Sequence, residues 1–439
     1  MIDPPDLNFT LHDTMRATHG LHAFAAKCAP PVTAWAIREY SHAGERVVDP
    51  MAGSGTTLVE GRLADRDVYG LDLDPLASLL SRVKATPLPL QRLQRASEAF
   101  VDVVNQECEA WERLRQRGSE MAEASKRLHL TVPTIPNFDY WFLPEVAAKL
   151  AIAKRAIDNA QASASIRSFL YVAFSSLIVA RTSVANARDV VHSRHHHMDH
   201  SKTPNVPLLL EQRMERMQRQ MADFVGSLSD RSTKRRTVML CGDARRLRMR
   251  TNSADLVFTS PPYCNALDYP RAHRFAVAWL GDVLGTSIES YRALARTYIG
   301  TDRASKALSF DANCIPVESP TAKRVIRDVA DKDHVLAAVI QRYFQDMTSV
   351  LSEIGRILKP GHHAVLVVCP SNIRRTSIPS HEVFVELSER LKLSGQYRLR
   401  TVATYERVID DRKRLLPYMD HTALAQRMRT EYVIVLRKH

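Results

Sequence analysis

The segment that most restricts the fold is the run 49–57, DPMAGSGTT, which separates a short apolar stretch from a helical pattern. Residues 45–49 (ERVVD) predict a strand that ends in an acid, and residues 57–64 predict the helix that follows. A second pair comes at once, because residues 67–72 (DVYGLD) predict another strand and Pro75 marks a helix start. Strands that alternate with helices predict a mainly parallel sheet, whose ligands bind beyond the carboxyl ends of the strands.

The composition of this glycine turn narrows the class of ligand. Gly53 and Gly55 let the backbone approach a ligand closely, because neither residue carries a Cβ atom. A phosphate-binding P-loop would need a lysine beside the final threonines, and a dinucleotide site would have a third glycine where Leu58 stands. The turn therefore favours a nucleoside with a small amino acid tail. Asp72, at the next strand end, is placed to accept hydrogen bonds from ribose hydroxyls.

The alternation of strands and helices is interrupted twice. Residues 91–127 and 145–185 have the helical period without strand signals, so we expect a helical insertion over 89–235. Its apolar segment 169–180 predicts a buried helix that is too short to cross a bilayer. Residues 264–334 form a second, irregular inserted segment. The other expected elements are strands at 237–240, 254–259, 363–369, 397–405 and 431–436, helices at 335–358 and 381–391, and a turn at 359–361.

A second motif, Ser260-Pro261-Pro262-Tyr263, directly follows an apolar strand. An exocyclic amine of cytosine or adenine is a weak nucleophile, because its lone pair is delocalised into the ring. Hydrogen-bond acceptors aimed at its N–H groups stabilise the positive charge that develops as the amine attacks a sulfonium methyl group. Ser260 Oγ can supply one acceptor and the Pro261 carbonyl the other, while the prolines add no competing N–H donor. Tyr263 offers a ring on which an extruded base can stack.

The two motifs together resemble those of S-adenosylmethionine-dependent DNA methyltransferases that act on amino groups. DPMAGSGTT is similar to the family's cofactor motif, in which phenylalanine is usual where Met51 stands, and SPPY is similar to its catalytic (S/N/D)PPY loop. Residues 19–30 (HGLHAFAAKCAP) resemble its N-terminal motif, which would place Phe24 near the cofactor. The resemblance implies a Rossmann-like α/β methyltransferase fold, with a mostly parallel sheet, an antiparallel last strand and a large helical insertion.

By this resemblance, the cofactor is S-adenosylmethionine, held by the glycine turn and by acids at strand ends. The turn would hold the methionine part, Asp72 the ribose with Asp74 as a helper, and Asp243 would lie near the adenine. The expected cofactor-binding residues are Phe24, Asp49, Gly53, Ser54, Gly55, Thr56, Thr57, Asp72 and Asp243. The expected catalytic residues are Ser260, Pro261, Pro262 and Tyr263.

Serine at the first position of the SPPY loop indicates the target base. Within the resembled family this serine is associated with cytosine N4, whereas adenine N6 enzymes more often have Asp or Asn there. We therefore expect a site-specific DNA methyltransferase that acts on cytosine N4 after base flipping. The alternatives are an adenine N6 or RNA amino-methyltransferase, and a catalytically silent nucleic-acid-binding protein of the same fold.

The motifs divide the chain into a catalytic domain and its insertions. Residues 1–88 and 236–439 would form the catalytic domain, which contains the second inserted segment 264–334, and the helical insertion 89–235 is the candidate for reading the DNA target. The cofactor motif precedes the catalytic motif, whereas many enzymes with SPPY have the reverse order.

Composition indicates the compartment and the partner. The formal net charge of +13 favours a polyanionic partner such as DNA, because clustered Lys and Arg displace counterions from phosphates. No secretory signal pattern is present, and no apolar run approaches the roughly 18 residues of a membrane span, so we expect a cytoplasmic protein. The resemblance adds a restriction or defence-system protein as a candidate partner, and the sequence indicates no particular oligomeric state.

Two other kinds of site are disfavoured by the sequence. Methylation of cytosine C5 needs a nucleophilic thiol, usually in a Pro-Cys pair, and none of the six cysteines follows a proline. A metal site is also not expected, because methyl transfer needs none, there is no CxxC pair, and the histidine cluster lies in a polar loop between helices. The cluster comprises His192, His195, His196, His197 and His200.

Overall fold

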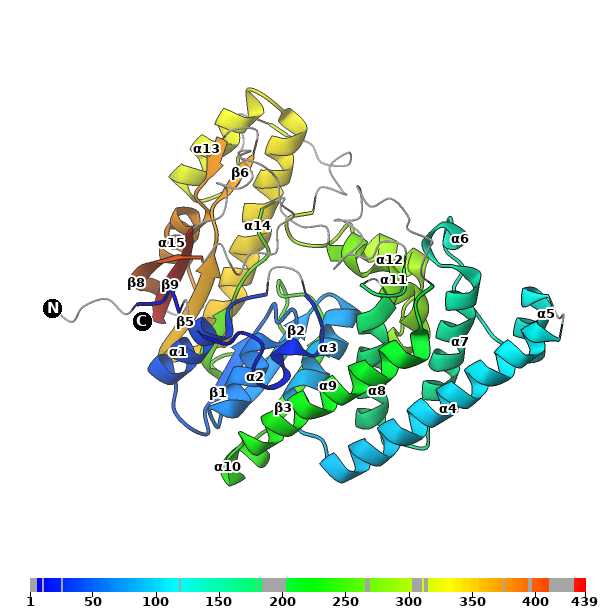
Figure 1. The fold of residues 1–439 in the computed structure, drawn as a ribbon. Helices are drawn as coiled ribbons and strands as arrows, with labels where there is room; N and C mark the ends of the chain where they lie inside the picture. The colour runs from blue at the N-terminus through cyan, green and yellow to red at the C-terminus, as the bar shows by residue number, and fades with distance from the viewer. Residues whose placement is uncertain are drawn as a thin grey trace.

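A seven-stranded sheet forms the centre of the protein, in the strand order β3-β2-β1-β4-β5-β9-β8 (Figure 1). Strands β3, β2, β1, β4 and β5 are parallel, and β9 runs antiparallel between β5 and β8. The sequence predicts this mostly parallel, Rossmann-like sheet with an antiparallel last strand, and the topology confirms it. The strands are β1 (Arg46–Asp49), β2 (Asp67–Asp72), β3 (Thr237–Cys241), β4 (Ala254–Thr259), β5 (Leu358–Val368), β8 (Leu399–Val408) and β9 (Thr430–Lys438).

The computed structural model describes most of the chain, with gaps. The described residues are 6–9, 12–24, 27–117, 120–178, 180–183, 203–264, 269–301, 310–311, 315–373, 376–393, 397–409 and 430–439.

Both faces of the sheet are buried, as expected for parallel strands. Val47 and Leu256 pack against α1, whereas their chain neighbours Val48 and Val257 pack against α14 and α15 on the opposite face. This alternation follows from the two-residue period of a strand. The helices of the two faces are α1 (Pro30–Tyr40), α2 (Thr56–Leu63) and α3 (Pro75–Ala85) on one side, and α13 (Pro320–Ala330), α14 (His334–Ile357) and α15 (Ser380–Arg390) on the other.

A group of helices replaces the strand–helix alternation between β2 and β3, as the sequence predicts. These helices pack against α3 and a short 3₁₀ helix, η1 (Ala17–Gly20), and lie away from α13–α15 (Figure 1). They are α4 (Leu90–Gln116), α5 (Met121–Arg127), α6 (Phe138–Trp141), α7 (Pro144–Asp158), α8 (Ala164–Ile178), α9 (Val206–Gly226) and α10 (Asp230–Thr233). The predicted buried helix corresponds to α8, whose Phe169 and Phe174 are fully buried. None of the described helices combines the length and apolar character of a membrane span.

Three local expectations differ from the structure. The helical stretches expected at 91–127 and 145–185 are each broken, the second at residues 159–163 between α7 and α8. The segment expected to be irregular contains α11 (Tyr269–Leu284), α12 (Ile288–Leu294) and α13. The turn expected at 359–361 is a bulge within β5, because the pairing with β4 jumps from Leu358 to His363. A short hairpin, β6 (Ser371–Ile373) and β7 (Thr376–Ile378), follows β5.

Candidate functional site

The carboxyl ends of β1, β2 and β4 open into one cavity. Gly53 of the glycine turn and Ser260 of the SPPY loop both line it, although the whole helical insertion separates them in the sequence. The two motifs therefore share a single cavity. The expected site residues that line it are Phe24, Asp49, Gly53, Ser54, Thr56, Thr57, Asp72, Asp243, Ser260 and Pro262. The expected site residues Gly55, Pro261 and Tyr263 are not among its lining residues.

The two glycines of the turn make room for different neighbours. Both have a left-handed backbone, with φ of +50° at Gly53 and +85° at Gly55. A Cβ atom on Gly53 would lie 3.2 Å from the Phe24 ring, at the cavity wall. A Cβ atom on Gly55 would lie 2.8 Å from Ser81 Cα, so this glycine lets α2 pack against α3. Ser81 also fixes the turn, because its hydroxyl donates to the Gly53 carbonyl over 2.7 Å.

Two carboxylates at strand ends hold the turn and face the cavity. Asp49 accepts hydrogen bonds from the Thr57 hydroxyl (2.5 Å) and the Met51 amide (3.1 Å), and burial raises its pKa to about 6. Asp72 accepts from the Gly53 amide at 2.7 Å, and burial, with the neighbouring Asp74 carboxylate, raises its pKa to about 7. Both carboxyls therefore titrate closer to neutral pH than ordinary aspartates do.

The SPPY loop continues β4 into the cavity. Ser260 and Pro262 line the cavity wall, and the Pro262 carbonyl accepts a hydrogen bond from the Tyr343 hydroxyl at 3.0 Å. Tyr263 points elsewhere: its hydroxyl donates to Glu431 over 3.4 Å, and Glu431 forms a 2.8 Å ion pair with Arg407. Burial, together with the Glu431 charge, raises the pKa of Tyr263 well above its usual value, so this hydroxyl stays protonated at physiological pH.

The second inserted segment covers the cavity. His273 on α11 and Tyr291 on α12 both bond the buried Asp74 carboxylate, over 2.7 and 2.8 Å. Burial raises the pKa of Asp74, but the His273 charge and these hydrogen bonds outweigh it and bring the pKa below its usual value. Asp74 also caps α3, so one side chain joins the cover to the sheet.

The cover also reaches the catalytic loop. Gly300 has a φ of +79°, and a Cβ atom there would lie 2.8 Å from the Tyr263 carbonyl oxygen. On the other side of the cover, the Thr297 carbonyl accepts a hydrogen bond from Arg245 at 3.0 Å, and Arg245 also pairs with Asp243 at 2.6 Å. The cover therefore touches both walls of the cavity.

The contact at Gly300 gives a testable prediction. Gly300→Ala is expected to lower the rate of methyl transfer about tenfold, because the added Cβ displaces the Tyr263 carbonyl and the loop that carries Ser260. Gly285→Ala is the matched control, since Gly285 has a similar φ of +65° but no atom within 4 Å of its Cβ position. Single-turnover rates at saturating cofactor make the comparison. Equal rates for Gly300→Ala and Gly285→Ala would contradict the prediction that the contact at Gly300 positions the SPPY loop.

Twelve lining residues were not among the expected site residues, and five of these lie outside the glycine turn and the strands with their immediate ends. Lys27 and Cys28 follow the motif residue Phe24, and the other three come from the second inserted segment, namely Tyr269, Tyr298 and Ile299. Position in the 19–30 motif was a usable signal for the first two. Tyr269 ends the run 265–269, which extends the SPPY motif in the sequence. No periodicity or motif marked Tyr298 and Ile299, because their place depends on contacts between segments far apart in the chain.

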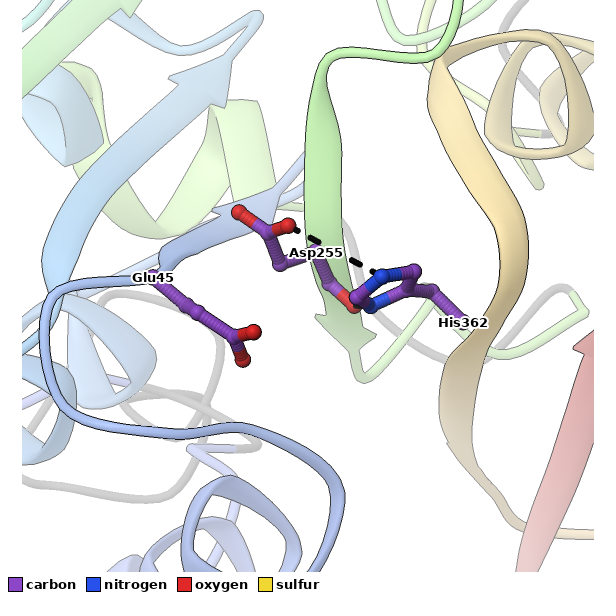
Figure 2. A group of neighbouring side chains, drawn as sticks. All are labelled: Glu45, Asp255 and His362. Atoms are coloured by element: carbon purple, nitrogen blue, oxygen red, sulfur yellow. Dashed lines mark hydrogen bonds and ion pairs between the residues drawn. The ribbon is translucent and has the colours of Figure 1, made fainter.

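Apart from the cavity, one cluster of side chains has residue types that can bind a metal ion. Among the described residues, Glu45, Asp255 and His362 lie at the amino ends of β1 and β4 and in the β5 bulge, away from the cavity (Figure 2). Asp255 is already satisfied, because Lys359 Nζ lies 2.5 Å from one oxygen and the Arg46 amide donates to the other at 2.9 Å. We assign no metal to this cluster. The histidines at 192–200 lie outside the described residues.

Comparisons with known proteins place the chain beside methyltransferases. It is 24% identical over 408 residues to the Type II methyltransferase M.MvaI of Kocuria varians, covering 89% of this chain and 85% of that protein. It is 29% identical over 103 residues to the Type II methyltransferase M.MjaII of Methanocaldococcus jannaschii, covering 23% of this chain and 19% of that protein. Homology to one Type II methyltransferase thus extends along most of the chain, and homology to the other covers about a quarter of it. No protein-family model matches it.

A comparison with solved structures adds no argument about the fold or the site. The rRNA methyltransferase aviRa from Streptomyces viridochromogenes aligns with 95% of this chain and 88% of its own, at 11% identity and a TM-score of 0.27.

Proposed function

We propose that the protein transfers the methyl group of S-adenosylmethionine to the exocyclic N4 of cytosine in DNA. The observation that carries the proposal is the shared cavity, which is lined by both the glycine turn and Ser260. Similarity to Type II methyltransferases along most of both chains supports it independently. The formal net charge of +13 suits a phosphate-rich substrate.

The residues of the cavity fit S-adenosylmethionine. The left-handed Gly53 leaves room where a side chain would press on Phe24, so the turn of 53–57 would hold the methionine part. Asp72 would accept the ribose hydroxyls, and Asp243 would lie near the adenine. The carboxylates also suit the positive charge of the cofactor.

The SPPY loop would prepare the amine for attack. When bound, S-adenosylmethionine supplies a methyl group on positively charged sulfur, and that sulfur leaves with the electron pair of the broken S–C bond. Ser260 Oγ would accept a hydrogen bond from one N–H of the flipped base. The Pro261 carbonyl would accept the other N–H, since the Pro262 carbonyl already binds Tyr343. These acceptors stabilise the charge on nitrogen as the N–C bond forms, and the acidic product nitrogen then releases its proton to water.

Tyr263 would position the loop through its hydrogen bond to Glu431, because it is not among the residues that line the cavity. The helices between β2 and β3 are our candidate for reading the DNA sequence, because they lie beside the cavity cover and pack on α3 and α11.

Expression in a host without DNA methylation tests the proposal. Nucleosides from digested DNA and RNA are quantified by mass spectrometry, and the expected product is N4-methyldeoxycytidine in DNA, with long-read sequencing giving its sequence context. N6-methyladenine alone would overturn the choice of base. Methylated RNA alone would overturn the choice of polymer. No modified nucleoside, together with no uptake of crosslinked cofactor, would indicate a silent binding protein.

A further inference from the structure

The charges that line the cavity are strongly asymmetric. Its carboxylates are Asp49, Asp72, Asp74 and Asp243. Lys27 is the sole lysine or arginine side chain among the described residues that line it. A cavity made for a purely cationic ligand would have no use for this ammonium group. A cavity made for a ligand with several cationic or donor groups and a single carboxylate would have this composition.

The surroundings of Lys27 leave its charge uncompensated. Its Nζ donates to two neutral acceptors, the carbonyls of Thr14 and His19, over 3.3 and 3.4 Å. Within the described part of the chain, no carboxylate forms an ion pair with it, and Asp13, whose charge acts on it from a distance, is exposed. Burial lowers the pKa of Lys27. An ammonium carries three donors, so one donor and the countercharge remain to be supplied.

Neighbouring cations do not replace Lys27. Lys84 is 1% exposed, donates to the His22 carbonyl at 3.4 Å and is not a lining residue. Arg245 already forms ion pairs with Asp243 and Asp346, at 2.6 and 2.8 Å.

Lys27 lines the same cavity as the glycine turn and belongs to the chain segment that borders this turn. It follows Phe24, whose ring lies 3.2 Å from the Cβ position of Gly53 in the glycine turn. The turn is the part of the cavity that we assign to the methionine moiety. Asp72 and Asp243, assigned to the ribose and adenine, stand at the ends of β2 and β3.

We propose that Lys27 binds the carboxylate of the methionine moiety of S-adenosylmethionine. This inference rests on the proposed function, because it names a contact to the cofactor of that function. S-adenosylmethionine has one carboxylate, a sulfonium and an ammonium group, which matches one lysine set among several aspartates. The ligand carboxylate supplies the countercharge that Lys27 lacks, and Lys27 selects cofactors that carry it.

Isothermal titration calorimetry with two cofactors tests the contact without depending on activity. The probes are S-adenosylmethionine and decarboxylated S-adenosylmethionine, which differ by the carboxylate alone. The wild-type protein is expected to bind the decarboxylated cofactor about tenfold more weakly, as for the loss of a charge-assisted hydrogen bond. Lys27→Gln is expected to weaken binding of S-adenosylmethionine about tenfold and to leave the decarboxylated cofactor within about twofold.

Two further variants complete the test. Lys27→Arg keeps the charge and should retain part of the preference for the carboxylate, and Lys126→Gln, on the exposed face of α5, should behave as wild type. Equal affinity of the wild type for both cofactors would overturn the role of Lys27, even if Lys27→Gln failed to fold. Equal weakening of both cofactors by Lys27→Gln would do the same and would assign Lys27 to packing of the N-terminal segment. No binding of either cofactor by the wild type would instead refute the proposed function.

Discussion

Replacing Ser260 with alanine is expected to lower the rate of methyl transfer by about 100- to 1000-fold, with cofactor affinity within about twofold of wild type. In the proposed mechanism Ser260 Oγ is the side-chain acceptor of the SPPY loop, and Ser260 lines the same cavity as the glycine turn. The amine becomes positively charged only as the new bond forms, so this acceptor acts on the transition state more than on the bound cofactor. Single-turnover kinetics, with calorimetry of cofactor binding, separate the two effects.

The control for this variant is Ser349→Ala, which removes a hydroxyl from an exposed position of α14. Its rate should equal that of the wild type. If cofactor affinity fell as much as the rate, Ser260 would be a residue that binds the cofactor and would not be a catalytic residue. An unchanged rate in Ser260→Ala would leave the proposed mechanism without its side-chain acceptor.

The sheet and its two motifs could be predicted because their signals are local. Strands β1, β2 and β4 are short runs rich in apolar residues, and β2 and β4 begin and end at the residues expected. A parallel sheet brings the carboxyl ends of its strands to one edge, so motifs placed at those ends must lie together. That geometric rule alone puts Gly53 and Ser260 in one cavity.

The cover of the cavity could not be predicted, because it depends on pairs of residues far apart in the chain. His273 meets Asp74 across a separation of 199 residues, and Tyr291 meets the same carboxylate. From the sequence, Asp74 is expected only as a helper of Asp72 in binding the ribose, just before the helix start at Pro75. Its hydrogen bonds with His273 and Tyr291, beside its cap of α3, become visible only when α11 and α12 are placed next to α3.

Two of the three expected residues that do not line the cavity show a related limit. Gly55 belongs to a cofactor motif by its sequence, but its missing Cβ makes room for Ser81 and not for the cavity. Tyr263 follows the two prolines of the SPPY motif, but its hydroxyl donates to Glu431 on β9, which lies near the far end of the chain. A motif therefore groups residues by sequence, whereas the fold divides them between ligand and framework.

Cofactor affinity is expected to rise about tenfold between pH 6 and pH 8, and Asp72→Asn is expected to remove this rise and to weaken binding about 100-fold at pH 8. Burial, with the Asp74 charge, raises the pKa of Asp72 to about 7. Only the ionised carboxylate can accept two ribose hydroxyls and attract the cationic cofactor. Below pH 7 a proton competes with the cofactor, so affinity falls as pH falls.

The asparagine variant removes this titration and keeps one oxygen to accept from the Gly53 amide, but its amide nitrogen cannot accept from the Asp74 amide as the second Asp72 oxygen does at 2.9 Å. The pH slope carries the test, because the loss of that hydrogen bond does not depend on pH. Asp49, whose pKa burial raises to about 6, is present in both proteins, as is the cofactor's own amino group. The difference between the two calorimetric pH series therefore reports Asp72 alone. If wild type and Asp72→Asn showed the same slope, the carboxylate at the end of β2 would not be the ribose ligand, and Asp72 would serve only to fix the glycine turn.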